Sequence, residues 1–306
     1  MSFFLAVDAG GTKTDYLLAD DTQVLARVRT GTIKRMRTNT GTAATNLDSA
    51  LSQLSSMTGI SMSQVTRTCI GTAGETVPLV TDWLRASFKD RVAGELMLLG
   101  DVEIALDAAF PGQPGVLIVA GTGSNIAGRS PAGRLFGVGE WGPALADQGS
   151  GHKIGQEALR ALFLATDEGR TSLLLSAILD FWQLESQEQI IEYANRLPAP
   201  DFSRLTALVL DCANQGDEVA QSVLHREGED LAYLVRLIMR RLQLESAKEF
   251  KDKSWVPSLA FAGSIMGKVP PVRQALIAAV QREFPGVIAL DGVVDPIIGA
   301  LWPLMF

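Results

Sequence analysis

The sequence is short of the residues that build most metal and redox sites. Among its 306 residues it holds two cysteines, Cys69 and Cys212, and two histidines, His152 and His225. Thiols this far apart, with so few imidazoles, do not have the spacing of a zinc or iron–sulfur site. The scarcity of cysteine favours a reduced, cytoplasmic protein.

Basic charge and long apolar runs are also lacking. The formal net charge is −7, which argues against non-specific nucleic-acid binding because such binding needs a basic face. No apolar run reaches the ~18 residues of a membrane helix. The start, MSFFLAVDAGG, has no basic n-region and reaches Asp8 too early for a signal peptide. We therefore expect neither nucleic acid nor a membrane as a partner.

What is present is a repeated alternation of short apolar stretches and glycine-rich turns. The first half predicts strands over Phe3–Asp8, Thr14–Ala19, Val24–Arg29, Thr66–Gly71 and Glu95–Leu99, and helices over Ala43–Met57, Leu79–Phe88 and Val102–Phe110. After the turn PGQPG at 111–115 the pattern restarts, with three strand-like segments and then a helical half that includes Asp217–Leu244. The repeated order indicates an internal duplication and an α/β fold.

The first turn has the residues of a phosphate-binding loop. It lies within AVDAGGTKTDYLLAD, from Ala6 to Asp20, and offers glycine, hydroxyl and ammonium groups from Gly10, Gly11, Thr12, Lys13 and Thr14. Glycines let backbone N–H groups turn toward a ligand, and such a nest suits phosphate oxygens. Asp8, at the end of the preceding strand, would lie near the same phosphates, and Mg²⁺, held through water, is the usual cation between such anions.

The alternative is an ordinary hairpin in which Asp8 caps its own turn. A second turn of the same type stands at the matching place of the second half, with Gly121, Thr122, Gly123 and Ser124. The pair favours two loops that hold one polyphosphate over a single ordinary hairpin.

Two other glycine motifs predict nothing further. GGTKT lacks the spacing of a Walker loop and leads into a strand. GVGEWG, at 137–142, matches G-x-G-x-x-G, but a proline follows at once and no strand returns soon enough for a βαβ unit. A dinucleotide site is therefore disfavoured.

Three motifs together resemble a known family. DAGGTKT, GTGSN with the downstream GEWGPALADQGSGHKIG, and LAFAGS resemble the two phosphate motifs, the connecting motif and the adenosine motif of the superfamily of sugar kinases, heat-shock chaperones and actin. The chain is most similar to the N-acetylglucosamine kinase-like sugar kinases of the BadF/BadG/BcrA/BcrD ATPase family, from Val7 to Ala300.

The resemblance implies two ribonuclease-H-like domains, as in actin-like ATPases, with an inter-domain cleft. Residues 1–110 plus 293–306 would form the N-terminal domain, and residues 111–292 the C-terminal domain with its extra helices. The last helix, roughly 293–306, would return to the N-terminal domain. The implied activity is ATP-dependent phosphorylation of a hydroxyl of an amino sugar or hexose, and N-acetylglucosamine is the first candidate substrate. The implied cofactors are ATP and Mg²⁺, and the expected assembly is a homodimer.

The same resemblance assigns Asp101, in LLGDVEIALDAAF, as the catalytic base that also holds a sugar hydroxyl. The residues agree, because Asp101 follows a buried strand and begins a helix. Asp101 as a plain helix N-cap is the alternative, and the two roles are compatible. A helix N-terminus keeps a carboxylate ionised, and a general base must be ionised to accept a proton.

Further site residues are implied on both halves. Asn39, Trp141 and Asp147 would bind the sugar, and Gly263 and Ser264 would form the backbone bed for adenosine. For Trp141 the alternative is a buried structural tryptophan. We interpret His152, at the start of a probable helix, as a surface or capping residue rather than a catalyst.

The segment TGTIKRMRTNT departs from the family pattern with Lys34, Arg35 and Arg37. These cations are either a solvated charge run or a place for an extra anionic group. Glucosamine, glucose and N-acetylmuramic acid therefore stay open as substrates.

Two other functions are disfavoured by residues that the sequence lacks. In an iron–sulfur dehydratase-activator ATPase of the same superfamily a cysteine would stand where Gly149 and Ser150 stand. A sugar-sensing regulator of related fold tends to carry a DNA-binding segment, and none is recognised in this sequence.

Overall fold

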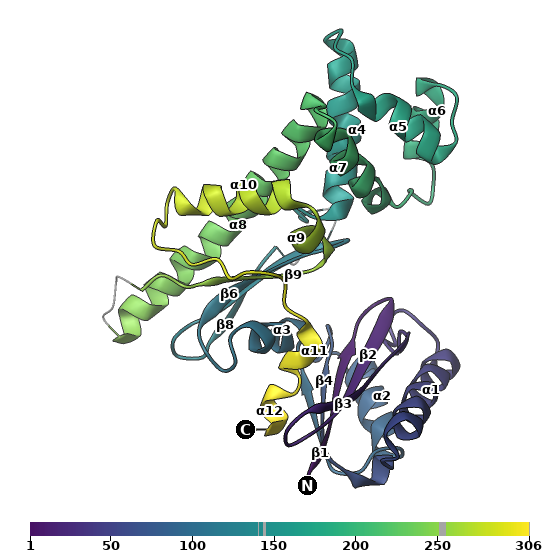
Figure 1. Cartoon of the computed structure of the whole chain (residues 1–306), viewed down its shortest axis with the longest axis vertical. Helices are drawn as coiled ribbons and strands as arrows, with labels where there is room; N and C mark the ends of the chain where they lie inside the picture. Colours follow the sequence, from purple (N-terminus) through teal and green to yellow (C-terminus); the bar gives the residue numbers. More distant parts are fainter. Residues whose placement is uncertain (140, 143–144, 251–254, 306) are drawn as a thin grey trace. The chain divides into compact units, whose positions relative to one another are not determined.

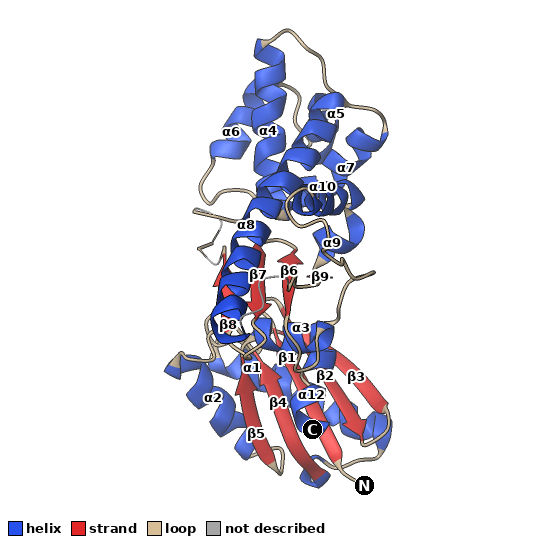
Figure 2. Ribbon diagram, turned by 90° about the vertical axis from the view of Figure 1, so that its left-hand side faces the viewer, coloured by secondary structure: helices blue, strands red, loops and turns tan. Residues whose placement is uncertain are grey.

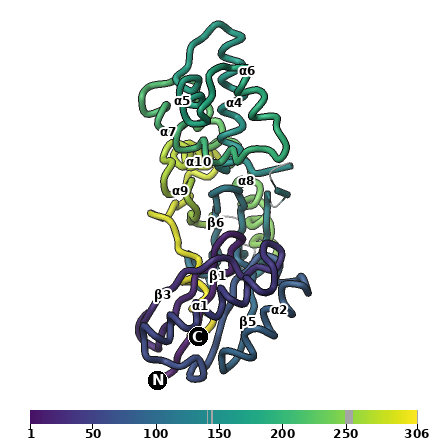
Figure 3. Tube along the Cα trace, turned by 90° about the vertical axis from the view of Figure 1, so that its right-hand side faces the viewer, coloured from purple at the N-terminus to yellow at the C-terminus, as the bar shows by residue number. Residues whose placement is uncertain are grey.

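The computed structural model describes residues 1–139, 141–142, 145–250 and 255–305, and it divides the chain into two compact units. Unit 1 comprises Met1–Gln113 with Val294–Phe306, and unit 2 comprises Pro114–Val293. The change of unit falls inside the PGQPG turn. Both ends of the chain belong to unit 1 (Figures 1 and 3).

Unit 1 is built on a five-stranded mixed sheet in the order β3-β2-β1-β4-β5. Its strands are β1 Phe3–Ala9, β2 Lys13–Asp20, β3 Val24–Gly31, β4 Val65–Gly71 and β5 Glu95–Leu99. The first three strands are antiparallel, whereas β1, β4 and β5 are parallel to one another. The carboxyl ends of these three parallel strands therefore meet at one edge of the sheet (Figure 2), which is where ligands bind in open α/β sheets.

The sheet of unit 1 is covered on both faces. Its helices are α1 Thr40–Thr58, α2 Pro78–Lys89, α3 Asp101–Ala109, α11 Pro296–Gly299 and α12 Trp302–Met305, with the short turn η1 at Met62–Gln64. Leu5 and Val7 of β1 share a core cluster with α1 and α2. Phe4 and Ala6, on the opposite face, share one with α3 and the C-terminal helices. The period-2 alternation of β1 thus creates two cores.

The C-terminal segment belongs to unit 1, but the prediction of one helix over 293–306 is wrong. The structure has the short helices α11 and α12, and Phe306 lies outside the described residues. Proline explains the break, because Pro296 and Pro303 have no N–H to donate and are tolerated only in the first turn of a helix. Each lies in the first turn of its own helix.

Unit 2 repeats the strand plan of unit 1. Its sheet has the order β8-β7-β6-β9, with β6 Gly115–Ala120, β7 Ser124–Arg129, β8 Leu135–Val138 and β9 Leu259–Ala262. As in unit 1, three antiparallel strands are followed by a parallel one. A parallel bridge between Leu259 and Ala289 adds a pairing where β5 stands in unit 1. The predicted duplication and α/β fold are confirmed.

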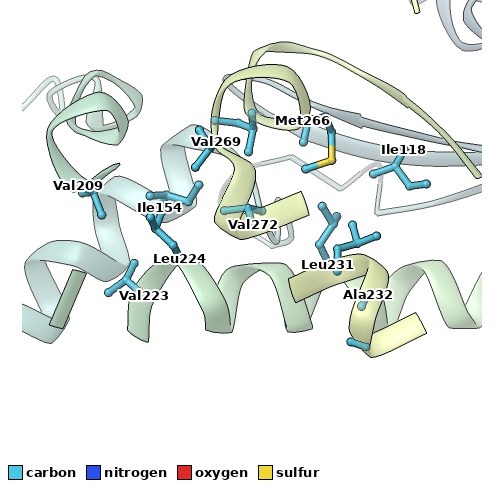
Figure 4. Packing of buried hydrophobic residues seen from close by; sticks show 14 of the residues in the cluster. Ile118, Ile154, Val209, Val223, Leu224, Leu231, Ala232, Met266, Val269 and Val272 are labelled. Atoms are coloured by element: carbon cyan, nitrogen blue, oxygen red, sulfur yellow. The ribbon is translucent and has the colours of Figure 1, made fainter. Parts of the chain in front are cut away.

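The helices of unit 2 are α4 Gly151–Asp167, α5 Leu173–Trp182, α6 Gln187–Asn195, α7 Thr206–Asn214, α8 Glu218–Phe250, α9 Ser264–Lys268 and α10 Pro270–Gln281, with a short turn η2 at Phe202–Leu205. The predicted helix 217–244 is the first part of α8. Figure 4 shows Leu224 and Leu231 of α8 facing Ile154 of α4 and Val272 of α10. This buried apolar face packs α8 against α4 and α10. No helix among the described residues is long and apolar enough to cross a membrane.

Candidate functional site

The turn between β1 and β2 is open to solvent and held from behind. Gly11, Thr12 and Lys13 are exposed, and Gly10 is partly exposed. The hydroxyl of Thr32 donates a hydrogen bond of 2.7 Å to the carbonyl of Gly10. The turn is therefore fixed by a neighbouring loop, and its outer side has the exposure that an anion-binding nest requires.

Thr14 has a different position from the rest of the turn. It is fully buried, and its hydroxyl oxygen accepts the backbone N–H of Ile33 at 3.1 Å. This bond holds the segment that follows β3 against the first hairpin. A direct contact between Thr14 and phosphate stays a prediction.

Asp8 lies at the carboxyl end of β1 in a strongly acidic environment. Burial, first of all, and the negative charges of Asp15, Asp101 and Asp295 together raise its pKa from 3.8 to about 6, while Lys13 opposes the rise. The structure thus brings Asp8 and Asp101 into electrostatic contact at one edge of the sheet. Asp295 belongs to the same group, and sequence reasoning did not find it, because it comes from the far end of the chain.

The other two carboxylates of this group already have cationic partners. Asp15 accepts Arg29 Nε at 2.9 Å and Arg27 at 3.3 Å, and Arg27 also pairs with Asp295. Asp8 has no hydrogen bond or ion pair with any described residue, so its charge is the one left to be neutralised by a ligand.

Asp101 is the first residue of α3, which follows β5. The N-cap is Gly100, and Asp101 Oδ1 accepts the N–H of Val102 at 2.9 Å. The alternative that Asp101 is itself the N-cap is wrong. Its place in the first turn still favours an ionised carboxylate, because the positive end of the helix dipole lies there.

The second turn, between β6 and β7, is tied to the start of α4. Gly151 and His152 donate their N–H groups to the carbonyls of Gly121 and Thr122, at 2.7 and 3.2 Å. Thr122 and Gly123 are exposed. The two turns have the same place in their units, and each presents a threonine at its tip.

Asp147 lies against this second turn. It is buried, has a positive φ of 81°, and accepts the N–H of Ser124 at 3.0 Å through Oδ1. The hydroxyl of Ser124 donates to the carbonyl of Gln148 at 2.8 Å. A non-glycine residue at such a φ is strained, and strain of this kind is typical of functional sites. The expected sugar residue Asp147 is thus joined to the expected phosphate residue Ser124, which the sequence did not predict.

A cavity of about 310 Å³ opens beside the second turn. It is lined by Gly121, Thr122 and Gly151 at the turn, by Ser264, Ile265, Lys268 and Val269 around α9, and by Ser203, Arg204, Thr206, Ala207 and Leu210 from η2 and α7. Gly263 precedes α9 with φ 89°, where a Cβ would come within 2.3 Å of the Ala120 carbonyl oxygen, so only glycine fits. The volume is at the lower end for a small-ligand pocket.

The η2 and α7 side of this cavity was missed by sequence reasoning. No glycine turn or charged motif marks it, and helix packing alone brings it beside the turn. The helical pattern of α7 does not distinguish residues that line a cavity from other residues of the helix.

The remaining residues singled out in the sequence lie in three different settings. Asn39 is the N-cap of α1, where its Oδ1 accepts the N–H of Thr42 at 2.8 Å. Trp141 is 74% exposed, so the alternative of a buried structural tryptophan is wrong. His152 is half-buried with its ring edge against Phe202. Glu140, Pro143 and Ala144 of the connecting and GVGEWG motifs lie outside the described residues.

The basic segment lies beside the first turn. A Cβ on Gly11 would be 3.8 Å from Arg37 Nε. Arg35 donates to the carbonyl of Thr38, whereas Lys34 and Arg37 form no ion pair with the described residues. Arg37 therefore lies beside the first turn without an ion-pair partner among the described residues.

The chain was compared with known proteins. The N-acetylmuramic acid/N-acetylglucosamine kinase of Clostridium acetobutylicum is 28% identical over 256 residues, which cover 81% of this chain and 83% of that protein. The N-acetyl-D-glucosamine kinase of Dictyostelium discoideum is 25% identical over 314 aligned positions, with 97% and 96% covered. The crystal structure of a protein described as an N-acetylglucosamine kinase from Chromobacterium violaceum has a TM-score of 0.70 at 25% identity, and it covers 100% of this chain and 99% of its own.

The chain also matches the profile of a protein family. The profile of the BadF/BadG/BcrA/BcrD ATPase family matches residues 5–302, which include both glycine turns, Asp101 and the connecting motif. The chain belongs to the BadF/BadG/BcrA/BcrD ATPase family.

Proposed function

We propose that this protein is an ATP-dependent sugar kinase that phosphorylates a hydroxyl of N-acetylglucosamine or a closely related amino sugar. The observation that carries the proposal is that the strand register brings Asp8 and Asp101 to the same carboxyl edge of the unit 1 sheet, beside an exposed glycine turn. Family membership and the relatives named above support the same activity.

In this proposal Asp101 is the general base. It holds the sugar hydroxyl and takes its proton as the phosphoryl group is transferred. Phosphoryl transfer has a loose transition state, so alignment and charge neutralisation supply most of the catalysis. Asn39 and Asp147 orient the sugar from its other hydroxyls, and Trp141 offers an exposed ring face to it.

The two turns hold the phosphates of ATP. Gly10, Gly11, Thr12 and Lys13 contribute from unit 1, and Gly121, Thr122, Gly123 and Ser124 from unit 2, while Thr14 holds the first turn in shape. The cavity beside Gly263 and Ser264 receives adenosine.

The residues around Asp8 fit a Mg²⁺ ion. Asp8 is a half-buried oxygen ligand that forms no hydrogen bond or ion pair with the described residues. No cluster of three or more metal-ligating side chains occurs in the described ranges. Mg²⁺ is usually held by one or two carboxylates, water and substrate phosphates, so Asp8 would hold it through water. Bound there, the ion would neutralise charge on the transferring phosphate.

A carboxylate-bearing amino sugar is the second candidate substrate, favoured by Arg37 beside the first turn and by Lys34 in the same segment. We expect Arg37→Ala to lower kcat/KM for N-acetylmuramic acid about tenfold, the scale of one charge-assisted hydrogen bond. The value for N-acetylglucosamine should change less than about threefold. Equal losses for both sugars would assign Arg37 to ATP instead.

The test of the function is a coupled ADP-release assay across N-acetylglucosamine, glucosamine, glucose and N-acetylmuramic acid. Sugar-dependent ADP release with at least one amino sugar is expected. Absence of turnover with every sugar would contradict the proposal and favour a sugar sensor.

A further inference from the structure

One buried acid has no role in the function described so far. Glu227, in the N-terminal third of α8, is 1% exposed, and its Oε2 accepts the backbone N–H of Gly149 at 2.8 Å. The two residues are 78 positions apart, so this bond ties α8 to the loop that precedes α4. Burying a carboxylate is costly unless hydrogen bonds or charges compensate it.

The same face of α8 clamps Gly149 from a second position. Gly149 has φ 72°, and a Cβ there would lie 2.7 Å from the side chain of Leu231, one helical turn after Glu227. Residues four apart lie on the same face of a helix. Glu227 and Leu231 therefore hold the 147–150 loop together, by a hydrogen bond and by packing.

This loop carries one residue of the proposed site, Asp147, and contacts another, Ser124. Asp147 precedes Gly149 by two residues and accepts the N–H of Ser124, and the hydroxyl of Ser124 donates to the carbonyl of Gln148. A chain of hydrogen bonds thus runs from Glu227 through the loop to the second phosphate turn.

The adjacent residue of α8 supports the adenosine side. A Cβ on Gly228 would come within 2.5 Å of the Val272 carbonyl oxygen of α10. Only glycine permits this approach, and α10 follows α9, which begins at Ser264. One turn of α8 therefore supports both the Asp147 loop and the helix pair that follows the adenosine bed.

We propose that Glu227 is a positioning residue, whose ionised carboxylate holds the 147–150 loop and so sets Asp147 for the sugar. The proposal rests on the proposed function for its kinetic part. The hydrogen bond to Gly149 is charge-assisted, and such bonds are stronger than neutral ones. Loss of the charge should therefore loosen the loop.

The surroundings of Glu227 make this charge sensitive to pH. Its pKa is raised to about 7, chiefly by burial and also by Asp230 and Glu157, while the Gly149 N–H and Lys153 oppose the rise. Lys153 and Glu157 come from α4. A cavity of about 250 Å³ beside Glu227 brings further charges from both helices and the following loop: Arg160, Arg170, Glu218 and Arg226. A carboxylate with this pKa is mostly protonated below pH 7, so activity should fall there.

Two substitutions and a control separate this role from a loss of folding. Glu227→Ala should lower kcat/KM for the sugar about tenfold or more at pH 8, since it removes a charged hydrogen-bond partner. The dissociation constant of an unhydrolysable ATP analogue should change less than about threefold, because the adenosine contacts remain. Glu227→Gln keeps an acceptor oxygen but not the charge, so its activity at pH 8 should match that of the wild type well below pH 7, and it should lose the decline near pH 7. Glu229→Gln, on the exposed side of α8 and paired with Arg282, should match the wild type.

Hydrogen exchange tests the bond without any kinase activity. Peptides that span 145–155 should exchange faster in Glu227→Ala at pH 8, with the rest of unit 2 unchanged. If the wild type phosphorylates no sugar, the proposed function fails and this measurement still decides the role of Glu227. Wild-type kinetics and exchange in Glu227→Ala would overturn the proposal. Equal losses of sugar and nucleotide binding with faster exchange throughout unit 2 would also overturn it, because they would indicate a purely structural role.

Discussion

Replacing Asp8 by asparagine should stabilise the protein while it destroys the activity. The carboxylate is buried among three other acidic side chains, which raises its pKa from 3.8 to about 6. Each unit of pKa shift corresponds to about 1.4 kcal/mol, so the ionised form costs the folded state at most about 3 kcal/mol. Asparagine has nearly the same shape and no charge, so it removes this cost.

The sign of the pH dependence follows from the raised pKa. Below about pH 4 Asp8 is protonated in the folded and the unfolded chain, and the two proteins should be equally stable. Between about pH 4 and 6 the unfolded chain ionises first, which lowers the stability of the wild type. Above about pH 6 the full cost is present, so the advantage of Asp8→Asn should be largest at pH 7 to 8.

The assay is thermal unfolding without nucleotide or Mg²⁺, from pH 4 to 8. We expect a higher midpoint for Asp8→Asn by several degrees at pH 8 and no difference near pH 4. Asp82→Asn, exposed on α2, is the matched control and should not change the midpoint at either pH. An Asp8→Asn variant that is no more stable than the wild type at pH 8 would refute the acidic environment of Asp8.

Other predictions concern the nucleotide. Gly11→Val and Thr122→Val should each weaken ATP binding far more than sugar binding, because the valine at position 11 blocks backbone approach to phosphate and the loss of the Thr122 hydroxyl removes a donor. Calorimetry with each ligand alone measures both affinities. An equal loss of sugar affinity would contradict this prediction. Ala207→Trp should fill the cavity beside α7 and raise the KM for ATP about tenfold or more with little change in sugar affinity, because Ala207 is exposed and lines that cavity. An unchanged KM for ATP would place adenosine elsewhere.

Local chemistry made the sheets and turns predictable. Short apolar stretches and glycine-rich reversals marked the strands of both units. Asp8 and Asp101 could be placed because Asp8 lies at the end of a strand and Asp101 comes just after one. The matching positions of the two turns revealed the duplication. These features depend on neighbours in sequence, and a single chain shows them.

What could not be predicted depends on contacts between distant segments. The burial of Thr14 follows from its bond to Ile33, and Asp147 meets Ser124 only because the loop folds back onto the hairpin. Ala207 reaches the cavity through helix packing. Glu227 looks like any acid on a long helix until its bond to Gly149 is seen. Pro296 and Pro303 are visible in the sequence, and in the structure the C-terminal segment forms two short helices, each with one of these prolines in its first turn.

The most direct test of the account is the turnover of Asp101→Asn. Asparagine can still accept a hydrogen bond from the sugar but cannot take its proton. We expect kcat to fall by roughly 10²–10⁴, the range for a positioned general base, while the dissociation constants of the sugar and of an ATP analogue, measured by calorimetry, change little. Near-normal turnover in Asp101→Asn would contradict the assignment of Asp101 as the base.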